Sequence, residues 1–226
     1  SSRDLGDIDP MKMNGKRMEK INYQKILDET LREVEKRETP PRLLLHSCCG
    51  PCSTYVLEYL SAYFEITVYY YNPNIYPPEE YRFREAEQEH LIDVLPARYP
   101  IHFQAAPYDP ETYFQAVQGM EDLPEKGSRC TVCFRLRLEQ AARFAKSHGF
   151  DYFTTTLSLS PHKNSQLLNT IGGELAEKFG VPYLFSDFKK KNGFKRSTEL
   201  TATYGMYRQD YCGCLFSYRA RREGIT

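Results

Sequence analysis

One stretch, His46-Ser47-Cys48-Cys49-Gly50-Pro51-Cys52, carries three of the seven cysteines of the chain. Residues 42–45 before it form a short apolar run that predicts a buried strand, and residues 53–60 after it predict a helix. The three cysteines therefore lie in a strand-to-helix turn. Open α/β sheets bind ligands outside the carboxyl ends of their strands, so we expect this turn to carry the chemistry.

The other four cysteines occur in two groups, Cys130-Thr131-Val132-Cys133 and Cys212-Gly213-Cys214. Such clustered thiolates suit tetrahedral zinc or an iron–sulfur cluster, both of which take four ligands. The adjacent pair Cys48 and Cys49 spans two irons of one cube more readily than it chelates one zinc. The spacing therefore favours a [4Fe–4S] cluster over zinc, with a buried apolar role as the alternative for any single cysteine.

Length and composition place the chain among cytoplasmic globular proteins. Its 226 residues suffice for one α/β domain with a sizeable core. No apolar run reaches the length of a membrane span, and the amino terminus lacks the pattern of a secretory signal, so we expect no membrane contact. An odd number of cysteines in that compartment argues against a disulfide framework.

The order of predicted elements indicates the fold class. Strands are predicted at residues 42–45, 65–71, 101–105, 152–157 and 181–185, and helices alternate with them. This predicts an α/β fold with an open, mostly parallel sheet and helices on both faces. The turns at residues 48–52, 72–78 and 158–164 then share one edge of the sheet.

The chain divides into a flexible leader, residues 1–20, and a single α/β domain, residues 21–226. Residues 186–226 form a basic carboxyl-terminal extension that carries the Cys-x-Cys pair. Residues 1–113 have a net charge of −6 and residues 114–226 have +6. This asymmetry suggests either a face that meets a polyanion or an uneven spread of solvated charge.

The Cys212-Gly213-Cys214 group admits two interpretations. A disulfide across one residue closes a small, strained ring, and strained disulfides are easily reduced and tend to be catalytic or regulatory. The pair either cycles between thiol and disulfide to pass electrons to the cluster or binds a second metal beside it.

The position of the cysteine turn invites comparison with nucleotide-binding folds. The helix after Pro51 directs its N-terminal dipole at the turn, which favours thiolates and an anionic cluster, and Gly50 lets the backbone approach such a cluster closely. The same position cradles phosphate in nucleotide-binding folds, but the chain lacks a phosphate-loop glycine pattern. We therefore expect no use of ATP.

Four segments together resemble the QueH family, the cobalamin-independent epoxyqueuosine reductases, over residues 40–220. They are the cysteine turn, a segment around Cys130 and Cys133 that includes Arg129, Arg135 and Leu136, the Cys-x-Cys pair, and residues 154–163 with Ser160, Pro161, His162 and Lys163. The resemblance implies a fold similar to the adenine-nucleotide α-hydrolase-like fold. It also implies reduction of epoxyqueuosine to queuosine at the wobble position of tRNA, the last step of queuosine biosynthesis.

The resemblance further implies roles for individual cysteines. It assigns the [4Fe–4S] cluster to Cys48, Cys49, Cys130 and Cys133 and makes Cys212 and Cys214 the redox-active pair. Cys52 either replaces one ligand of the adjacent pair or holds an additional iron.

Epoxide removal also needs protons, electrons and contacts to tRNA. Four residues on the predicted edge are candidate proton donors: His46, Tyr108, Asp109 and His162. The first candidates for phosphate contacts are Lys189, Lys190, Lys191, Lys195 and Arg196, and the second are Arg219, Arg221 and Arg222. The electron donor is not identified by the sequence. Two other functions use the same features: a zinc-stabilised RNA-binding module without catalysis, and a cluster-dependent tRNA thiolase, which would normally bring the phosphate loop that is missing.

Overall fold

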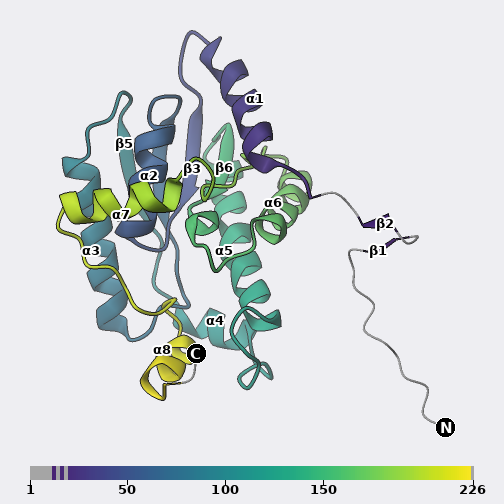
Figure 1. The fold of residues 1–226 in the computed structure, drawn as a ribbon, viewed down its shortest axis with the longest axis vertical. Helices are drawn as coiled ribbons and strands as arrows, with labels where there is room; N and C mark the ends of the chain where they lie inside the picture. The colour runs from purple at the N-terminus through teal and green to yellow at the C-terminus, as the bar shows by residue number, and fades with distance from the viewer. Residues whose placement is uncertain (1–11, 14–15, 18–19, 225–226) are drawn as a thin grey trace.

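A computed structural model describes residues 12–13, 16–17 and 20–224, and its core is a four-stranded sheet (Figure 1). All the strands are parallel, in the order β5-β4-β3-β6. Their bounds are Arg42–His46 for β3, Glu65–Tyr70 for β4, Ile101–Ala105 for β5 and Tyr152–Thr155 for β6. The expected α/β fold with an open parallel sheet is confirmed.

The chain changes direction across the sheet at β3. It proceeds outward from β3 to β4 and β5, then returns so that β6 pairs with the opposite side of β3. His46, the last residue of β3, is therefore level with Tyr69 on one neighbour and with Thr155 on the other. The carboxyl ends of β3 and β6 mark the topological switch point, where open sheets form their ligand crevice.

The fifth predicted strand, at residues 181–185, is wrong. This segment makes a single parallel bridge, between Tyr183 and Phe153, and does not extend into a strand. Pro182 has no N–H to donate, although its carbonyl accepts from the backbone N–H of Phe153. The segment covers the edge of β6 without continuing the ladder.

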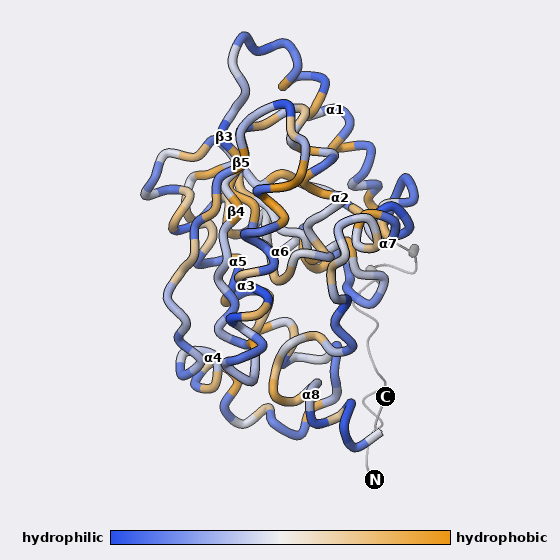
Figure 2. Tube along the Cα trace, turned by 90° about the vertical axis from the view of Figure 1, so that its left-hand side faces the viewer, coloured by the Kyte–Doolittle hydropathy of each residue, from blue (hydrophilic) through white to orange (hydrophobic). Residues whose placement is uncertain are grey.

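Helices cover both faces of the sheet, as predicted. Leu43 and Leu45 of β3 point to one face, and Leu44 points to the other because side chains alternate along a strand. The first face packs against α1, α2, α3 and α7, and the second against α5 and α6. The sheet and the inner faces of these helices form the apolar centre of the molecule (Figure 2). The helices are α1 (Tyr23–Glu35), α2 (Gly50–Leu60), α3 (Pro78–Val94), α4 (Pro110–Ala116), α5 (Ser128–Ser147), α6 (Ser165–Phe179), α7 (Gly193–Thr203) and α8 (Leu215–Arg222), with a 3-10 turn, η1, at Leu157–Leu159.

Capping residues fix the ends of several helices. The side chain of Asp109 accepts from the backbone N–H of Thr112 and Pro110 opens α4, as its sequence predicts. Gly180 ends α6 in a left-handed conformation with φ of 70°, which glycine adopts without strain.

The predicted leader, residues 1–20, lies mostly outside the described residues. Its described part contains two antiparallel strands of two residues each, β1 (Lys12–Met13) and β2 (Lys16–Arg17). The extension contains α7, whose Leu200 enters the core beside α2, and α8, which lies with α4 beyond the carboxyl end of the sheet (Figures 1 and 2). Among residues 20–224, no helix is both long enough and apolar enough to cross a bilayer.

Candidate metal and redox site

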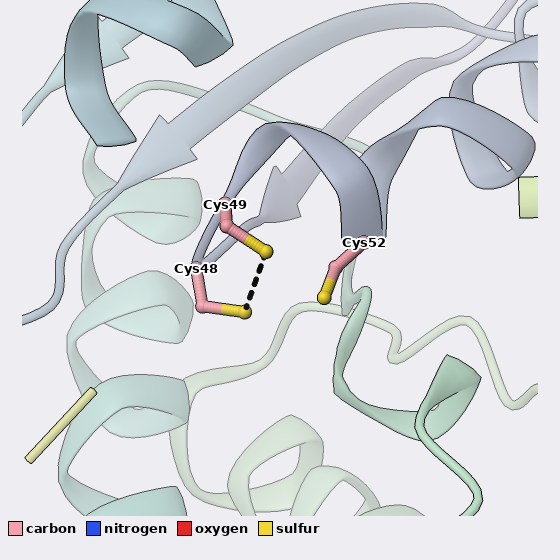
Figure 3. A group of neighbouring side chains, drawn as sticks. All are labelled: Cys48, Cys49 and Cys52. Carbon is pink, nitrogen blue, oxygen red and sulfur yellow. Dashed lines mark hydrogen bonds between the residues drawn. The ribbon is translucent and has the colours of Figure 1, made fainter. Parts of the chain in front are cut away.

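The cysteine turn brings three sulfur atoms together at the switch point (Figure 3). The Sγ atoms of Cys48, Cys49 and Cys52 all lie within 4.8 Å of one another, and those of Cys48 and Cys49 are 3.8 Å apart. Cys49 is the N-cap of α2, but its side chain makes no capping hydrogen bond, so its sulfur is directed into the group of three. Cys48 and Cys49 are buried, and Cys52 is partly exposed.

Buried polar groups hold this turn from beneath. The Ser47 hydroxyl lies 2.6 Å from Oε1 of Gln88 and 3.1 Å from the Cys49 carbonyl. The Gln88 amide nitrogen donates to the Ser53 hydroxyl, and that of Asn72 donates to the Ser47 carbonyl. Since β3, α2, α3 and the loop after β4 all contribute, the turn is fixed by the core of the domain.

His46 belongs to the same buried network. Its Nε2 faces the Tyr71 carbonyl at 3.0 Å and Oδ1 of Asn72 at 3.2 Å, both acceptors, so Nε2 carries the proton. Its Nδ1 then accepts from the Thr155 hydroxyl. Burial, followed by the nearby Arg137 guanidinium, lowers the pKa of His46 to about 4, so the ring is neutral near pH 7. Both nitrogens are engaged with the protein, which leaves neither free for a substrate.

The second cysteine group lies at the start of α5. Cys130 contacts the apolar cluster that contains Cys48 and Cys49, and its sulfur accepts from the backbone N–H of Lys126 at 3.3 Å. Cys133, one turn later, is buried in a different cluster that it shares with Cys214 and Tyr113. The start of α5 therefore connects the cysteine turn to the Cys-x-Cys pair.

The third group sits on a loop clamped by Arg84 of α3. The Arg84 guanidinium is buried, donates to the carbonyls of Cys212 and Tyr211 at 3.2 and 3.3 Å, and pairs with Glu80 at 2.8 Å. Gly213 has φ of 128°, and a side chain there would lie 3.0 Å from Nη1 of Arg84. The close approach of arginine and backbone explains the glycine between the two cysteines.

Further contacts seat this loop on the segment after β4. The backbone N–H of Tyr76 donates to the Gly213 carbonyl at 2.7 Å, and the Tyr211 hydroxyl donates to the Tyr76 carbonyl at 2.7 Å. Cys214 is the N-cap of α8, and its sulfur accepts from the backbone N–H of Ser217. Both Cys212 and Cys214 are free thiols here, as are the other five cysteines.

The thiols of the turn differ in their pKa values. Hydrogen bonds from Cys49 and Cys52 hold the pKa of Cys48 well below its usual range, and the charges of Lys163 and Arg137 act in the same direction. The hydrogen bond with Cys48 raises the pKa of Cys52 to about 12, and the hydrogen bonds with Cys48 and Cys52, followed by burial, raise the pKa of Cys49. Cys48 is therefore the first thiol of the turn to carry negative charge.

Two cationic side chains lie among the three cysteine groups. Burial tends to lower the pKa of the Lys163 ammonium, but its electrostatic interactions with Cys212, Cys48 and Cys52 raise it above its usual value. Arg137 is fully buried and is influenced by Cys133, Cys212 and Cys48. Each cation thus interacts electrostatically with members of at least two of the three cysteine groups.

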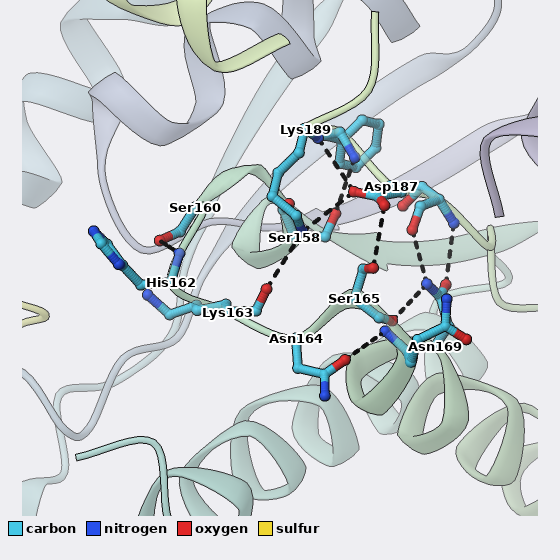
Figure 4. A network of polar contacts seen from close by, with 12 residues as sticks. Ser158, Ser160, His162, Lys163, Asn164, Ser165, Asn169, Asp187 and Lys189 are labelled. Carbon is cyan, nitrogen blue, oxygen red and sulfur yellow. Dashed lines mark hydrogen bonds and ion pairs between the residues drawn. The ribbon is translucent and has the colours of Figure 1, made fainter. Parts of the chain in front are cut away.

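A polar network holds the loop that carries Lys163 (Figure 4). The Lys189 ammonium donates to the carbonyls of Ser158 and Lys163 at 2.9 and 3.3 Å and pairs with Asp187 at 3.2 Å. The Ser165 hydroxyl donates to the same aspartate. Lys189, predicted to contact phosphate, thus also anchors the loop after β6.

The other predicted phosphate contacts differ in their availability. Lys191 pairs with Asp28 at 2.9 Å, and Arg196 pairs with Glu58 through two nitrogens. Lys190 and Lys195 are exposed.

The remaining candidate proton donors also have structural partners. The Tyr108 hydroxyl donates to the Ile75 carbonyl, and Asp109 caps α4. His162 lies exposed in the loop after β6, where its backbone N–H donates to the Ser160 hydroxyl. Asp109 and His162 are both exposed, but the Asp109 carboxylate is engaged in the cap of α4, which leaves His162 as the exposed candidate without a side-chain partner among the described residues.

The structure also assigns Gly50 a different neighbour from the one we expected. A side chain at Gly50 would collide with the methyl group of Met206, which comes from the extension. The close approach at this glycine is therefore made by the protein itself.

Sequence reasoning missed the residues that surround the cysteines: Arg84, Arg137, Lys163 as a charged partner, and Asn72. One signal was available for Arg137, which stands four positions after Cys133 and so shares its face of a helix. Arg84 is distant from every cysteine in the sequence, and no local pattern marks it. Asn72 opens the turn at residues 72–78 that was predicted to share the edge with the cysteine turn, but its contact with Ser47 was not predicted.

Comparison with known proteins identifies the family of the chain. The family profile described as "Epoxyqueuosine reductase QueH" matches residues 43–220. The chain belongs to the epoxyqueuosine reductase QueH family. A member from Streptococcus pyogenes serotype M1 is 42% identical over 97% of this chain and 86% of its own length. Members from Staphylococcus epidermidis and Thermotoga maritima are 42% and 35% identical, over 92% and 80% of this chain and 88% and 92% of their own lengths.

Family membership confirms the resemblance drawn from the cysteine groups and makes the chain an enzyme. The matched region contains all three cysteine groups, the loop with Lys163 and the clamp residue Arg84. The cysteine trio is able to hold a metal or a cluster.

Proposed function

We propose that this protein reduces the epoxide of epoxyqueuosine to the alkene of queuosine at the wobble position of tRNA, with a [4Fe–4S] cluster as its cofactor. The observation that carries the proposal is the convergence of three cysteine groups, far apart in sequence, at the switch point of the sheet. The names of the relatives supply the substrate: each is an epoxyqueuosine reductase.

The reaction balances with two electrons and two protons. Both carbon–oxygen bonds of the epoxide break, a carbon–carbon double bond forms, and the oxygen leaves as water. The electrons come from an external reductant. The protein must accept these electrons at its surface and pass them inward to the site. When bound, the cluster supplies one-electron transfer and a metal that can polarise the epoxide oxygen.

The donor set fits such a cluster. Cys48, Cys49, Cys130 and Cys133 would hold it, since they offer four thiol ligands from two helix starts, the number that a [4Fe–4S] cluster takes. The close trio of Cys48, Cys49 and Cys52 is also a plausible ligand set for a single tetrahedral ion. In this proposal Cys52 is the ligand for an additional iron or a substitute for one member of the adjacent pair.

Cys212 and Cys214 act as the redox pair. Their loop is clamped beside the cysteine turn by Arg84, and Cys214 shares a buried cluster with Cys133. When the two thiols close a disulfide, they release two electrons and two protons, the number that one epoxide consumes. Each turnover then requires an external reductant to reopen the disulfide.

For the proton to the departing oxygen we retain His162. The other three candidates hold protein partners through the groups that would donate, whereas His162 is exposed on the loop after β6. The adjacent Lys163 interacts electrostatically with Cys212, Cys48 and Cys52 and favours negative charge on them.

Two surfaces support binding of tRNA. Lys190 and Lys195 present exposed charge at the start of the extension. An open cleft of about 630 Å³ lies beside the redox loop, and its aromatic side chains suit stacking of unpaired bases. The aromatic residues are Phe83, Tyr207, Tyr211 and Tyr218. Its two arginines lie among the carboxylates of Glu79, Glu80 and Asp210, and Arg221 pairs with Asp210, so the cleft offers little charge to phosphate.

The decisive experiment uses protein purified without oxygen. We expect about four iron and four sulfide per chain and conversion of epoxyqueuosine-containing tRNA to queuosine-containing tRNA with dithionite as reductant. The nucleosides are quantified by mass spectrometry after digestion. Colourless protein with stoichiometric zinc and no product would support a zinc-stabilised RNA-binding module instead.

The tRNA surface is tested separately. The double variant K190E/K195E should bind tRNA about tenfold more weakly at physiological salt and show a shallower salt dependence. The matched control K25E/K146E changes two exposed lysines elsewhere and should leave affinity unchanged. Equal affinities of both variants would remove Lys190 and Lys195 from the tRNA surface.

A further inference from the structure

Arg137 carries a permanent positive charge into the interior of the protein. It lies on α5, one turn after Cys133, and its exposed fraction is 1%. A guanidinium does not lose its proton inside a protein, so its charge must be matched by an anion or by hydrogen bonds. The contacts of Arg137 supply neither in full.

The hydrogen bonds of Arg137 are long and incomplete. Its Nε donates to the Cys133 carbonyl and its Nη1 to Oδ1 of Asn72, each at 3.5 Å. Its Nη2 is buried and has no hydrogen-bond partner within the described part of the chain. No carboxylate among residues 20–224 pairs with it, although seven other arginines or lysines of α3, α5 and the extension have such pairs.

Two other buried arginines are held more tightly than Arg137. Arg84 pairs with Glu80 and donates to two carbonyls of the redox loop. Nη1 of Arg129 lies within hydrogen-bond distance of three carbonyls, and the guanidinium stacks on Phe216 at 4.4 Å, although its Nε is a buried donor without a partner in the described residues. Both arginines hold backbone in place through at least one contact shorter than 3.3 Å or an ion pair, whereas the two hydrogen bonds of Arg137 are each 3.5 Å long.

The surroundings of Arg137 indicate where its Nη2 donor is directed. Its Nε contacts the Cys133 carbonyl at the start of α5, and its Nη1 contacts Asn72, whose amide nitrogen donates to the carbonyl of Ser47 beside Cys48. The guanidinium therefore lies between the second cysteine group and the cysteine turn. An anionic group held by these cysteines would supply the counter-charge that Arg137 lacks.

We infer that Arg137 is the fixed counter-charge of the cysteine site and donates its free Nη2 N–H to a sulfur of the group bound there. This inference rests on the proposed function. A positive charge and an N–H···S hydrogen bond both stabilise the more negative, reduced state of a cluster, and hydrogen bonds to sulfur are an established determinant of cluster potentials. Arg137 is thus a positioning residue that raises the reduction potential and makes the first electron easier to accept.

Substitution of Arg137 tests this role through the potential of the cluster. The variant R137M keeps the length of the side chain but loses charge and donors, and we expect its ratio of reduced to oxidised cluster at a given potential to fall at least about tenfold, equivalent to 59 mV for one electron. R137K keeps the charge and loses the Nη2 donor, so we expect a smaller fall, about threefold. The matched control R143M removes an exposed arginine of the same helix and should keep the wild-type potential.

Potentials are measured by anaerobic redox titration, with iron and sulfide counted in every sample. R137M that retains a full cluster at the wild-type potential would overturn the inference and leave the proposed function intact. If R137M does not fold, as judged by circular dichroism, R137K decides: a potential equal to those of wild type and R143M overturns it. Wild-type protein that holds zinc and no cluster would overturn the proposed cofactor and the inference together.

Discussion

The cysteine turn and the redox loop hold cysteines by different means. Cys48 and Cys49 follow directly from β3, and the turn is fixed by backbone pairing with two neighbouring strands and by the buried Ser47–Gln88 contact. Cys212 and Cys214 lie in irregular chain that is seated by the side chain of Arg84 and by two hydrogen bonds to Tyr76. The turn is thus part of the core, whereas the loop is docked onto it.

This difference has a functional consequence. A ligand site gains from a turn that cannot move, because preformed ligands bind a metal without a cost of ordering. A pair that opens and closes a disulfide needs room for its sulfur atoms to approach and separate, which a docked loop provides. Metal content and turnover should therefore respond separately to mutation.

The largest effect is expected at the turn. C48S should lose most of its iron and sulfide, and activity should fall by about a thousandfold or more because the group that carries the chemistry is gone. Iron, sulfide and queuosine formation are measured on the same anaerobic sample, with circular dichroism to confirm folding. Full cluster content in C48S would remove Cys48 from the ligand set.

C212S should show the opposite combination. We expect wild-type iron and sulfide but a loss of turnover of about a hundredfold or more, since one thiol cannot form the disulfide. A single turnover with a pre-reduced cluster separates electron relay from substrate binding. Loss of iron from C212S would show that Cys212 is a ligand and would end the separation between the two regions.

R84M should loosen the docked loop while sparing the turn. Removal of the guanidinium leaves Glu80 and two carbonyls without their donor, which we expect to cost about 3 kcal/mol of unfolding free energy. Hydrogen exchange should rise in residues 211–214 and stay unchanged in residues 46–52, and turnover should fall about tenfold. The control R82M changes an exposed arginine of the same helix; equal exchange in both variants would contradict the clamp.

The smallest effect concerns Glu87, whose Oε2 accepts from the backbone N–H of Tyr207 just before the loop. Burial raises the pKa of this carboxyl above its usual value of 4.5. The folded chain therefore binds the proton more tightly than the unfolded chain, so the contribution to stability is present below about pH 4.5 and is lost as the pH rises through the folded pKa.

E87Q keeps an acceptor for Tyr207 and removes the charge. We expect a gain in unfolding free energy at pH 7 of less than about 1 kcal/mol, reduced by solvent screening, and no gain at pH 4. Urea unfolding at both pH values measures it, with the exposed E89Q as control. An equal gain at pH 4 and pH 7 would show that ionisation of Glu87 is not the cause.

Much of the fold followed from local sequence. Apolar runs located the four strands, Asp109 and Pro110 located the start of α4, and the alternation of strands and helices predicted the parallel sheet. Residues 181–185 were predicted as a strand from their apolar and aromatic composition. They make a single bridge, between Tyr183 and Phe153, and Pro182 has no N–H with which to extend the ladder. The same is true of the site. The cysteines could be predicted as site residues from their spacing in the sequence, but Arg84 and Arg137, which contact the cysteine groups, could not.

The sequence by itself determined that this protein belongs to a family of cysteine-rich reductases and that the turn after β3 stands at its centre, because clustered thiols and strand-to-helix turns are local features. The tertiary structure decided which groups meet there. It brought the charges of Arg137 and Lys163 near the cysteine groups. It also engaged both nitrogens of His46 in hydrogen bonds to the protein and made Lys189 a hydrogen-bond donor to the loop after β6. These outcomes depend on contacts between residues far apart in the chain. Such contacts form because a buried charge or polar group is costly unless it is paired or hydrogen-bonded.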